Sequence, residues 1–434
     1  AGVTTRTPDG RTPSRQLDEI RSRVEELSAI HEELYLGELV PALAAVGIRL
    51  VGWDDLGPDE RKAFAEEFHD RIFPILTPLA VDPSHPFPYI SNLSLNLAVT
   101  VRHAGSNTVR FARVKVPSSL PRFLSLPDGS AHVPVEQVIA AHLGLLFPGM
   151  EVVDVEAFRV TRNADLDLDE EEAEDLLTAV ELELRRRRFN QAVRLEVGPT
   201  MGADSLALLQ EELDVGEQEV YVCRAPIGLA GLGGLAALDR PELHLVPMTP
   251  LPEPRLNAAD AEGIDLFAEL RRGDVLVHHP YVSFRSSVET FLSRAALDPA
   301  VLAIKITLYR TSGDTPIVNA LIRAAELGKQ VVALVELKAR FDEQANIEWA
   351  RRLEKAGVHV VYGLVGLKTH TKTTLVIREE EGRLRRYWHI GTGNYNSRTA
   401  QRYEDLGLFS ADEQIGDDLI GLFNFLTGFG FEPA

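Results

Sequence analysis

Four short segments in the last third of the sequence carry side chains that suit phosphate chemistry. They are Arg310 in ITLYR, Arg340 in ELKARFDE, His370 with Lys372 in KTHTK, and Asn394 in GTGNYN. Each segment lies at or beside the end of a predicted strand. Because ligands of open α/β sheets bind beyond the strand ends, these side chains can converge on one crevice.

His370 and Lys372 are the leading candidates in this set. Side chains alternate along a strand, so residues two apart point to the same face and place an imidazole beside an ammonium group. A neutral imidazole nitrogen can attack phosphorus and hold the group as a phosphoramidate. Lys372 would neutralise charge in the transition state, and the Arg310 and Arg340 guanidinium groups would bind phosphate oxygens. The glycines near Asn394 let the backbone approach an anion closely.

Structural roles for such residues stay open at this stage. A single histidine on a strand is more often a core or surface residue than a nucleophile, and an arginine after a strand is usually part of an ion pair. We therefore interpret the nearby carboxylates Glu336, Asp342 and Glu343 as arginine partners. We expect His389 to be buried rather than catalytic. Tyr403 could stack on a nucleotide base or pack in a core.

The histidine segment also has the spacing of a phosphodiesterase motif. His370 and Lys372, followed about twenty residues later by GTGN, resemble the phospholipase D motif. A phospholipase D-like phosphodiesterase is therefore an alternative. The sequence departs from that motif at Ile377, which stands where the motif carries Asp.

Strand-like and helix-like runs alternate around these segments. The predicted strands are 301–309, 331–337, 358–362, 372–378 and 385–391, and the predicted helices are 316–327 and one that ends near Gly357. Strands that alternate with helices predict a mostly parallel sheet with right-handed crossovers.

Changes of pattern along the chain predict three domains. Apolar residues recur at helical spacing after a loose arm, so we expect residues 1–78 to be an incomplete helical N-terminal domain. Alternating strands predict an α+β middle domain over 79–255. The stretch VPMTPLPEPRL precedes an α/β domain over 256–434. The predicted fold class is thus multidomain, α/β and α+β.

The charge distribution favours a local anionic ligand over nucleic acid. The net charge of −20 argues against a general nucleic-acid binder, because that binding needs concentrated Lys and Arg. Residues 301–403 nevertheless contain 17 Lys and Arg against 10 Asp and Glu, a local excess of +7. A basic segment in an acidic chain indicates a local anion site.

Cysteine usage and hydropathy indicate the setting of the chain. Cys223 is the only cysteine, which excludes an internal disulfide and fits a reducing, cytoplasmic environment. No apolar run approaches the roughly 20 residues of a membrane-spanning helix. The sequence leaves open whether the protein is peripheral at a membrane.

Several long stretches resemble the polyphosphate kinase family, the histidine-phosphorylating type with phospholipase D-like catalytic domains. They are PFPYISNLSLNLAV, LAIKITLYRT, ELKARFDEQANIEWA, GLKTHTKTTLVI and HIGTGNYNSRTAQRYEDLGL. The resemblance spans nearly the whole chain. It implies a phospholipase D-like α/β fold for residues 256–434 and reversible transfer of the terminal phosphate of ATP to polyphosphate. ATP, ADP, polyphosphate and Mg²⁺ are the ligands it implies.

The same resemblance implies roles for individual residues. His370 would be the phosphohistidine nucleophile, and Tyr403 would contact ATP. Arg310 and Arg340 would lie at the magnesium-phosphate positions. Because a guanidinium group has no lone pair for a metal, we interpret these arginines as binding phosphate oxygens that also hold the ion, and we assign no direct protein ligand to magnesium.

Two further expectations come from the resemblance. The family suggests homo-oligomers formed through the helical and middle domains. The chain also departs from the family, since it begins inside the expected helical domain and stops near Pro433, where a second catalytic domain is expected. It resembles a fragment that could be inactive alone, which makes a noncatalytic polyphosphate-binding module a second alternative.

Overall fold

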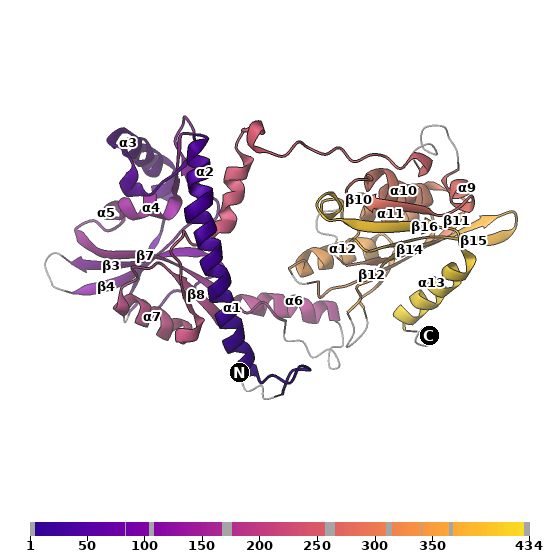
Figure 1. The fold of residues 1–434 in the computed structure, drawn as a ribbon. Helices are drawn as coiled ribbons and strands as arrows, with labels where there is room; N and C mark the ends of the chain where they lie inside the picture. Colours follow the sequence, from indigo (N-terminus) through magenta and orange to yellow (C-terminus); the bar gives the residue numbers. More distant parts are fainter. Residues whose placement is uncertain are drawn as a thin grey trace. The chain divides into compact units, whose positions relative to one another are not determined.

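The chain divides into two units. The computed structural model describes residues 5–82, 84–103, 108–166, 176–256, 265–309, 315–339, 341–363 and 368–428. One unit comprises Ala1–Ala164 and Arg187–Leu243, and the other comprises Asp165–Arg186 and His244–Ala434. Figure 1 shows the elements of each unit. The three domain ranges drawn from the sequence stay predictions.

The first unit joins a helical N-terminal segment to two sheets. Helix α1 (Pro13–Glu33) begins after Thr12, whose hydroxyl accepts a hydrogen bond from the Arg15 amide and so caps the helix. A π-helical turn (Leu34–Leu39) and α2 (Val40–Ala45) continue it. The other elements are α3 (Pro58–Glu67), α4 (Val135–Ala141), α5 (Leu143–Leu146), α7 (Ala203–Leu213), β1 (Arg49–Leu50), β2 (Pro78–Val81), β3 (Leu95–His103), β4 (Val109–Lys115), β5 (Phe123–Ser125), β6 (Ala131–Pro134), β7 (Met150–Arg162), β8 (Ala192–Val197) and β9 (Val220–Val222).

The larger sheet of this unit is covered on both faces. Among the described residues it has six strands in the order β2-β4-β3-β7-β8-β9, and a separate sheet has the order β1-β6-β5. Along β3, Leu97, Val99 and Val101 point into one apolar cluster and Ala98 into another. This alternation is what a strand buried on both faces requires.

The second unit is built on one mixed sheet. Its strands are β10 (Val275–His279), β11 (Val301–Leu308), β12 (Gln330–Val335), β13 (His359–Val361), β14 (Lys372–Glu380), β15 (Arg383–Gly391) and β16 (Asp405–Ser410). Its helices are α6 (Leu176–Arg186), α9 (Leu266–Arg271), α10 (Thr290–Leu297), α11 (Thr315–Glu326), α12 (Glu343–Lys355) and α13 (Glu413–Leu426). Within the described ranges the strand order is β10-β16-β15-β14-β11-β12-β13.

The prediction of a mostly parallel sheet in this unit is wrong. β11, β12 and β13 are parallel, but the pairs β10–β16, β16–β15, β15–β14 and β14–β11 are antiparallel. The reason is local. Only Glu381 and Gly382, both with positive φ, join β14 to β15, and such a two-residue turn connects antiparallel neighbours. The mixed α/β fold class and the helical N-terminal region are confirmed.

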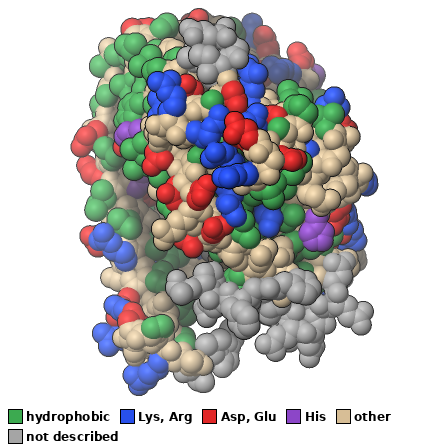
Figure 2. Space-filling model, turned by 90° about the vertical axis from the view of Figure 1, so that its right-hand side faces the viewer, with side chains coloured by type: hydrophobic (Ala, Val, Ile, Leu, Met, Phe, Trp, Pro, Cys, Tyr) green, Lys and Arg blue, Asp and Glu red, His purple; other side chains and the backbone are tan. Residues whose placement is uncertain are grey.

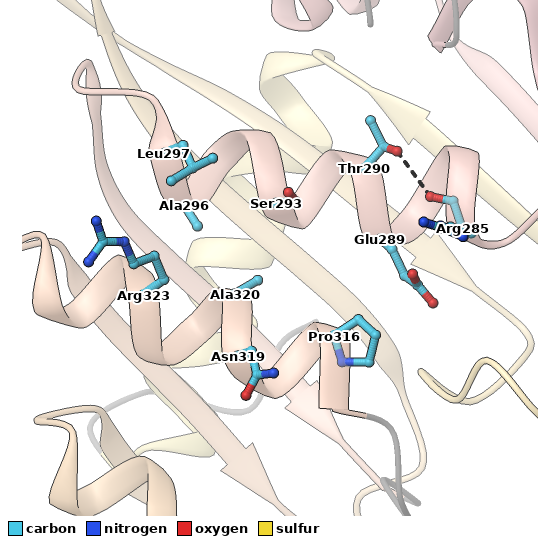
Figure 3. A pocket seen from close by; sticks show the side chains of 10 residues that line it. All are labelled: Arg285, Glu289, Thr290, Ser293, Ala296, Leu297, Pro316, Asn319, Ala320 and Arg323. Carbon is cyan, nitrogen blue, oxygen red and sulfur yellow. Dashed lines mark hydrogen bonds between the residues drawn. The ribbon is translucent and has the colours of Figure 1, made fainter.

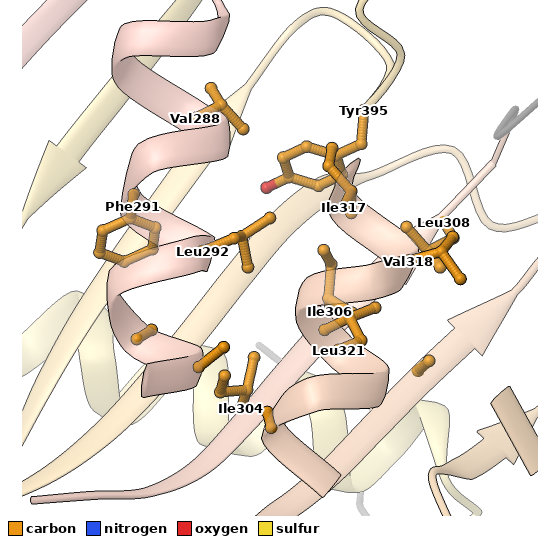
Figure 4. Packing of buried hydrophobic residues seen from close by; sticks show 14 of the residues in the cluster. Val288, Phe291, Leu292, Ile304, Ile306, Leu308, Ile317, Val318, Leu321 and Tyr395 are labelled. Carbon is orange, nitrogen blue, oxygen red and sulfur yellow. The ribbon is translucent and has the colours of Figure 1, made fainter. Parts of the chain in front are cut away.

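Helices cover both faces of this sheet. Val376 of β14 and Tyr387 of β15 belong to the main apolar cluster of this unit. Their neighbours Leu375 and Trp388 point the other way, into the apolar contact with α13. Figure 4 shows the part of the main cluster where side chains of β11 pack against α10 and α11. Each fully buried large side chain contributes about 2 kcal/mol, so this double layer fixes the strands whose ends carry the candidate residues.

Helix α6 belongs to the second unit, although it lies between β7 and β8 in the sequence. Leu177 and Val180 on α6 join the apolar cluster of that unit. Glu181 forms an ion pair with Arg351 of α12, with an Oε1 to Nη1 distance of 2.7 Å. Helix α6 therefore packs as part of the second unit.

Candidate active site

The described candidate residues gather at one edge of the seven-stranded sheet. At this edge β10, β11, β12 and β15 end, while β14 and β16 begin, as the pairing of Lys372 with Gly391 and of Leu308 with Val335 requires. We refer to residue 309 and residues 336–338, 368–372 and 392–405 as the site edge. His370, Lys372, Asn394 and Tyr403 all lie in these ranges. Arg310 and Arg340 lie outside the described residues.

His370 and Lys372 meet around Tyr309. The rings of Tyr309 and His370 are edge to face, with centroids 4.8 Å apart and planes at 81°. Lys372 Nζ lies 5.0 Å from the centre of the Tyr309 ring and donates a hydrogen bond to the His370 carbonyl oxygen. Lys368 Nζ lies 5.7 Å from the same ring. Two lysines and one imidazole therefore surround one aromatic ring.

The two candidates differ in accessibility. Lys372 is 4% exposed, whereas His370 is an exposed residue. The imidazole can therefore be reached by a ligand while its lysine neighbour is held in place. Sequence reasoning missed Tyr309, and its position at the end of a buried strand beside Arg310 was the available signal.

Glu336 differs from its interpretation as an arginine partner. Its Oε1 accepts a hydrogen bond from the Lys338 amide at 3.0 Å, and its Oε2 accepts one from the Thr369 amide at 2.9 Å. The carboxylate thus joins two segments of the site edge, residues 336–338 and residues 368–372, through their backbone amides. Asp342 is the residue before α12 and Glu343 is the first residue of α12.

Asn394 lies in a loop that its neighbour anchors in the core. The Tyr395 ring packs among the aliphatic side chains near α10 and α11 (Figure 4). Its hydroxyl accepts a hydrogen bond from Thr374 Oγ1 at 2.9 Å and lies 2.8 Å from His389 Nδ1. Asn394 Oδ1 is buried and has no hydrogen-bond partner among the described residues. The side-chain oxygen of Asn394 is therefore free to accept a hydrogen bond from a ligand donor.

The expectation that His389 is buried is confirmed. Burial, with a smaller contribution from His279, lowers the pKa of His389 to about 3. The imidazole is consequently neutral near pH 7, and it serves the packing of the sheet between Tyr395 and Phe409.

Tyr403 is 64% exposed, which makes the core-packing alternative for this residue wrong. Its amide donates a hydrogen bond of 2.9 Å to the Thr399 carbonyl oxygen, so the backbone is held while the ring faces solvent. An exposed aromatic ring beside a strand end is available to stack on a planar ligand.

Ile377 does not lie at the site edge. It is a partly buried residue of the apolar contact with α13, together with Leu375 and Trp388. The position that carries Asp in the phospholipase D motif is therefore turned toward hydrocarbon in this chain.

A separate groove lies between α10 and α11 (Figure 3). Its volume is about 340 Å³. Arg285 and Glu289 lie near one end and Arg323 near the other. Because acidic and basic side chains both line it, the groove does not have the single-sign charge of an anion site.

The described ranges hold neither a candidate metal cluster nor a candidate membrane-spanning helix. No group of three or more His, Cys, Asp or Glu side chains there could hold a metal ion. No helix in that part of the chain is long and apolar enough to cross a membrane.

Two family models match most of the chain. Residues 59–235 match the polyphosphate kinase middle domain, and residues 265–431 match polyphosphate kinase C-terminal domain 1.

Curated proteins and a solved structure give the same result. The chain is 53% identical to a polyphosphate kinase of Mycolicibacterium gilvum and 56% identical to one of Streptomyces coelicolor, each over 99% of this chain. It covers 59% and 57% of those relatives, so it spans less than two thirds of their length. The crystal structure of polyphosphate kinase from Porphyromonas gingivalis matches 96% of this chain and 61% of its own, with 30% identity and a TM-score of 0.78.

Proposed function

Because its two matching family models together cover more than half of it, the chain belongs to the polyphosphate kinase family, and we propose that the whole protein transfers the terminal phosphate of ATP reversibly to polyphosphate. The names of relatives that match nearly the whole chain support this proposal. The observation that carries it is the exposed His370 imidazole beside Lys372 and Tyr309 at the site edge.

In the first half-reaction, a ring nitrogen of His370 attacks the γ-phosphorus of ATP. An N–P bond forms, the bond from phosphorus to the bridging oxygen breaks, and that oxygen leaves on ADP with the electron pair. Lys372 and Lys368 supply positive charge beside the phosphate oxygens, where negative charge is spread in the transition state.

In the second half-reaction, a terminal oxygen of polyphosphate attacks the same phosphorus. The N–P bond breaks, its electron pair returns to the imidazole, and the polyphosphate chain is one phosphate longer. The reaction is reversible because phosphoanhydride bonds of similar energy are broken and formed on the two sides.

Other site residues have supporting roles in this proposal. Arg310 and Arg340 bind phosphate oxygens, the side-chain NH₂ group of Asn394 donates to a phosphate oxygen, and Tyr403 stacks on the adenine ring. Both oxygens of Glu336 are engaged by backbone amides, so we assign magnesium to phosphate oxygens near the arginines and not to a protein ligand. When bound there, the ion supplies further positive charge to the transferring phosphate.

Labelling with γ-labelled ATP and magnesium tests the proposal. Wild type should acquire acid-labile, base-stable label, and His370→Ala should acquire none. His359→Ala is the matched control, because His359 is an exposed histidine of β13 in the same unit. Label that persists on His370→Ala would contradict the assignment.

The full-length protein should be labelled in parallel. If it takes up label while the chain alone does not, residues outside this chain are needed for the first half-reaction. If polyphosphate is bound without any label on either protein, the noncatalytic alternative is correct. Hydrolysis of a phosphodiester by either would instead favour the phosphodiesterase.

We also infer a homo-oligomer and a cytoplasmic location, with peripheral membrane attachment left to experiment. Light scattering on the full-length protein would measure the first, and cell fractionation would measure the second. The single cysteine, Cys223, supports a reducing compartment.

A further inference from the structure

We propose that Glu336 and Asn346 form a buried clamp that positions the His370 segment for phosphoryl transfer, an inference that rests on the proposed function. We refer to these two side chains as the Glu336–Asn346 clamp. Neither is the reacting group. They act through the backbone that carries it, so both are positioning residues.

Glu336 joins two loops with one carboxylate. It follows β12 and is 3% exposed. The Thr369 amide, directly before His370, donates to Oε2, and the Lys338 amide donates to Oε1. Hydrogen bonds to an ionised acceptor are about twice as strong as neutral ones, so this carboxylate holds both loops firmly.

Asn346 joins the ends of two strands to the first turn of α12. Its side chain is completely buried, and Nδ2 donates to the carbonyl oxygens of Tyr309 and Glu336, each at 2.8 Å. Tyr309 carries the ring that contacts His370, and Glu336 carries the carboxylate that holds Thr369. One side-chain amide therefore ties together the backbones of the two residues that carry the ring and the carboxylate.

Hydrogen bonds also hold the backbone that follows His370. Thr307 Oγ1 donates to the Thr371 carbonyl oxygen at 2.8 Å and accepts from the Thr373 amide at 3.1 Å. His370 thus lies between two backbone groups that buried side chains fix, while its own ring is exposed. This arrangement delivers a reachable imidazole from a rigid support, which is what a nucleophile requires.

The chemistry of the clamp explains why a carboxylate is used. Two N–H donors face Glu336, and a carboxylate offers an acceptor oxygen to each. Glutamine has the same shape, but its NH₂ group would face one of the donors. Glu336→Gln is therefore a conservative variant that should open one side of the clamp.

Amide hydrogen exchange of the full-length protein tests the clamp without any substrate. In Glu336→Gln and Glu336→Ala, we expect peptides that cover residues 368–373 to exchange at least about tenfold faster than in wild type. Glu269→Gln is the matched control, because Glu269 is a buried carboxylate of α9 that pairs with Arg255 and Arg272. Unchanged exchange at 368–373 in both Glu336 variants would overturn the proposal.

The rate of His370 phosphorylation tests the role of the clamp. At saturating ATP we expect Glu336→Gln to be labelled about 10- to 100-fold more slowly, with little change in the ATP concentration that gives half-maximal rate. A wild-type labelling rate in Glu336→Gln would overturn the positioning role. So would an equal loss of labelling rate in Glu269→Gln, provided that the two variants have the same Tm. Absence of label on wild type would count against the proposed function instead, and the exchange result would still decide the clamp.

Discussion

The two opposite edges of the seven-stranded sheet differ in the contacts that their described charged side chains make. We define the far edge by the β14–β15 turn and the segment before β11. There Arg378 pairs with Asp298 at 2.9 Å and with Glu380 at 2.6 Å, and Glu380 also pairs with Arg271 at 2.9 Å. Although burial acts to raise it, hydrogen bonds from Tyr387 and Arg378 lower the pKa of Glu380. Figure 2 shows the right-hand side of the molecule in Figure 1, where basic and acidic side chains are interleaved.

At the site edge Glu336 and Lys372 make other contacts. Glu336 bonds to backbone amides, while Lys372 lies over the Tyr309 ring and bonds to a carbonyl oxygen. A ring face and a carbonyl attract a cation without cancelling its charge. We therefore expect the Arg378 network to serve stability and Lys372 to serve the proposed phosphate transfer. Mutations at the two edges should separate these effects.

Lys372→Met should have the largest effect. Methionine keeps the hydrophobic packing on Tyr309 but removes the charge, so we expect His370 phosphorylation to slow by about 100- to 1000-fold. Stability should change much less. Lys305→Met, on β11 of the same sheet, is the matched control and should be labelled at the wild-type rate. Equal labelling of Lys372→Met and wild type would remove the distinction between the edges.

Arg378→Met should show the reverse pattern. Removal of one partner from a largely buried ion network leaves Asp298 and Glu380 less compensated, and we expect a loss of about 2–4 kcal/mol in the free energy of unfolding. The folded variant should be phosphorylated at the wild-type rate. Urea denaturation measures the first quantity, with exposed Arg383→Met as a control of small effect. A stability loss as small as that of the control would refute the stabilising role of the far edge.

Gly407→Ala tests the packing of β16 next to the site edge. A Cβ at Gly407 would lie 2.6 Å from His389 Nε2 and 3.0 Å from Val277 Cγ2, inside the buried sheet. We expect a loss of about 1–3 kcal/mol in unfolding free energy. Gly421→Ala in α13 is the control, since a Cβ there meets no atom within 4 Å and a helical alanine should be neutral or stabilising. Equal thermal stability of Gly407→Ala and wild type would show that neighbouring side chains can shift to accommodate the added methyl group.

The smallest effect should be a pH dependence due to His389. Its folded pKa of about 3 is below the ordinary histidine pKa of 6.5, so between these pH values the unfolded chain binds a proton that the folded chain does not. Stability should therefore fall as pH drops below 6.5, by at most about 1.4 kcal/mol per pH unit. His389→Gln should reduce this slope, while His279, whose pKa burial also lowers, contributes in both proteins. The unfolding free energy of both proteins would be measured by chemical denaturation at pH 6.5 and 5.5. An equal loss of stability in wild type and His389→Gln over this interval would contradict the buried neutral state of His389.

Local patterns predicted the elements of the second unit but not their pairing. The predicted strand 301–309 and helix 316–327 are found as Val301–Leu308 and Thr315–Glu326. Strand order and direction depend on contacts between distant segments, which periodicity does not encode. The Glu381–Gly382 turn is the exception, because a two-residue connection between strands indicates an antiparallel pair. That indication comes from the length of the turn and not from the apolar residues of the strands beside it.

The site was predicted only in part for a related reason. Strand alternation suggested that His370 and Lys372 share a face, and the structure places both against Tyr309. The clamp could not be foreseen, because Glu336 and Thr369 are 33 residues apart and meet through a backbone amide that has no sequence signature. The roles of Arg310 and Arg340, outside the described residues, stay predictions.

Direct location of the phosphate tests the central claim. The full-length protein would be incubated with ATP and magnesium, digested at alkaline pH, where phosphohistidine survives, and sequenced by electron-transfer fragmentation. The account predicts phosphate on the imidazole of His370, appearing with ATP and lost on addition of polyphosphate. Polyphosphate synthesis with an unmodified His370, or with phosphate on a different residue of this chain, would contradict it.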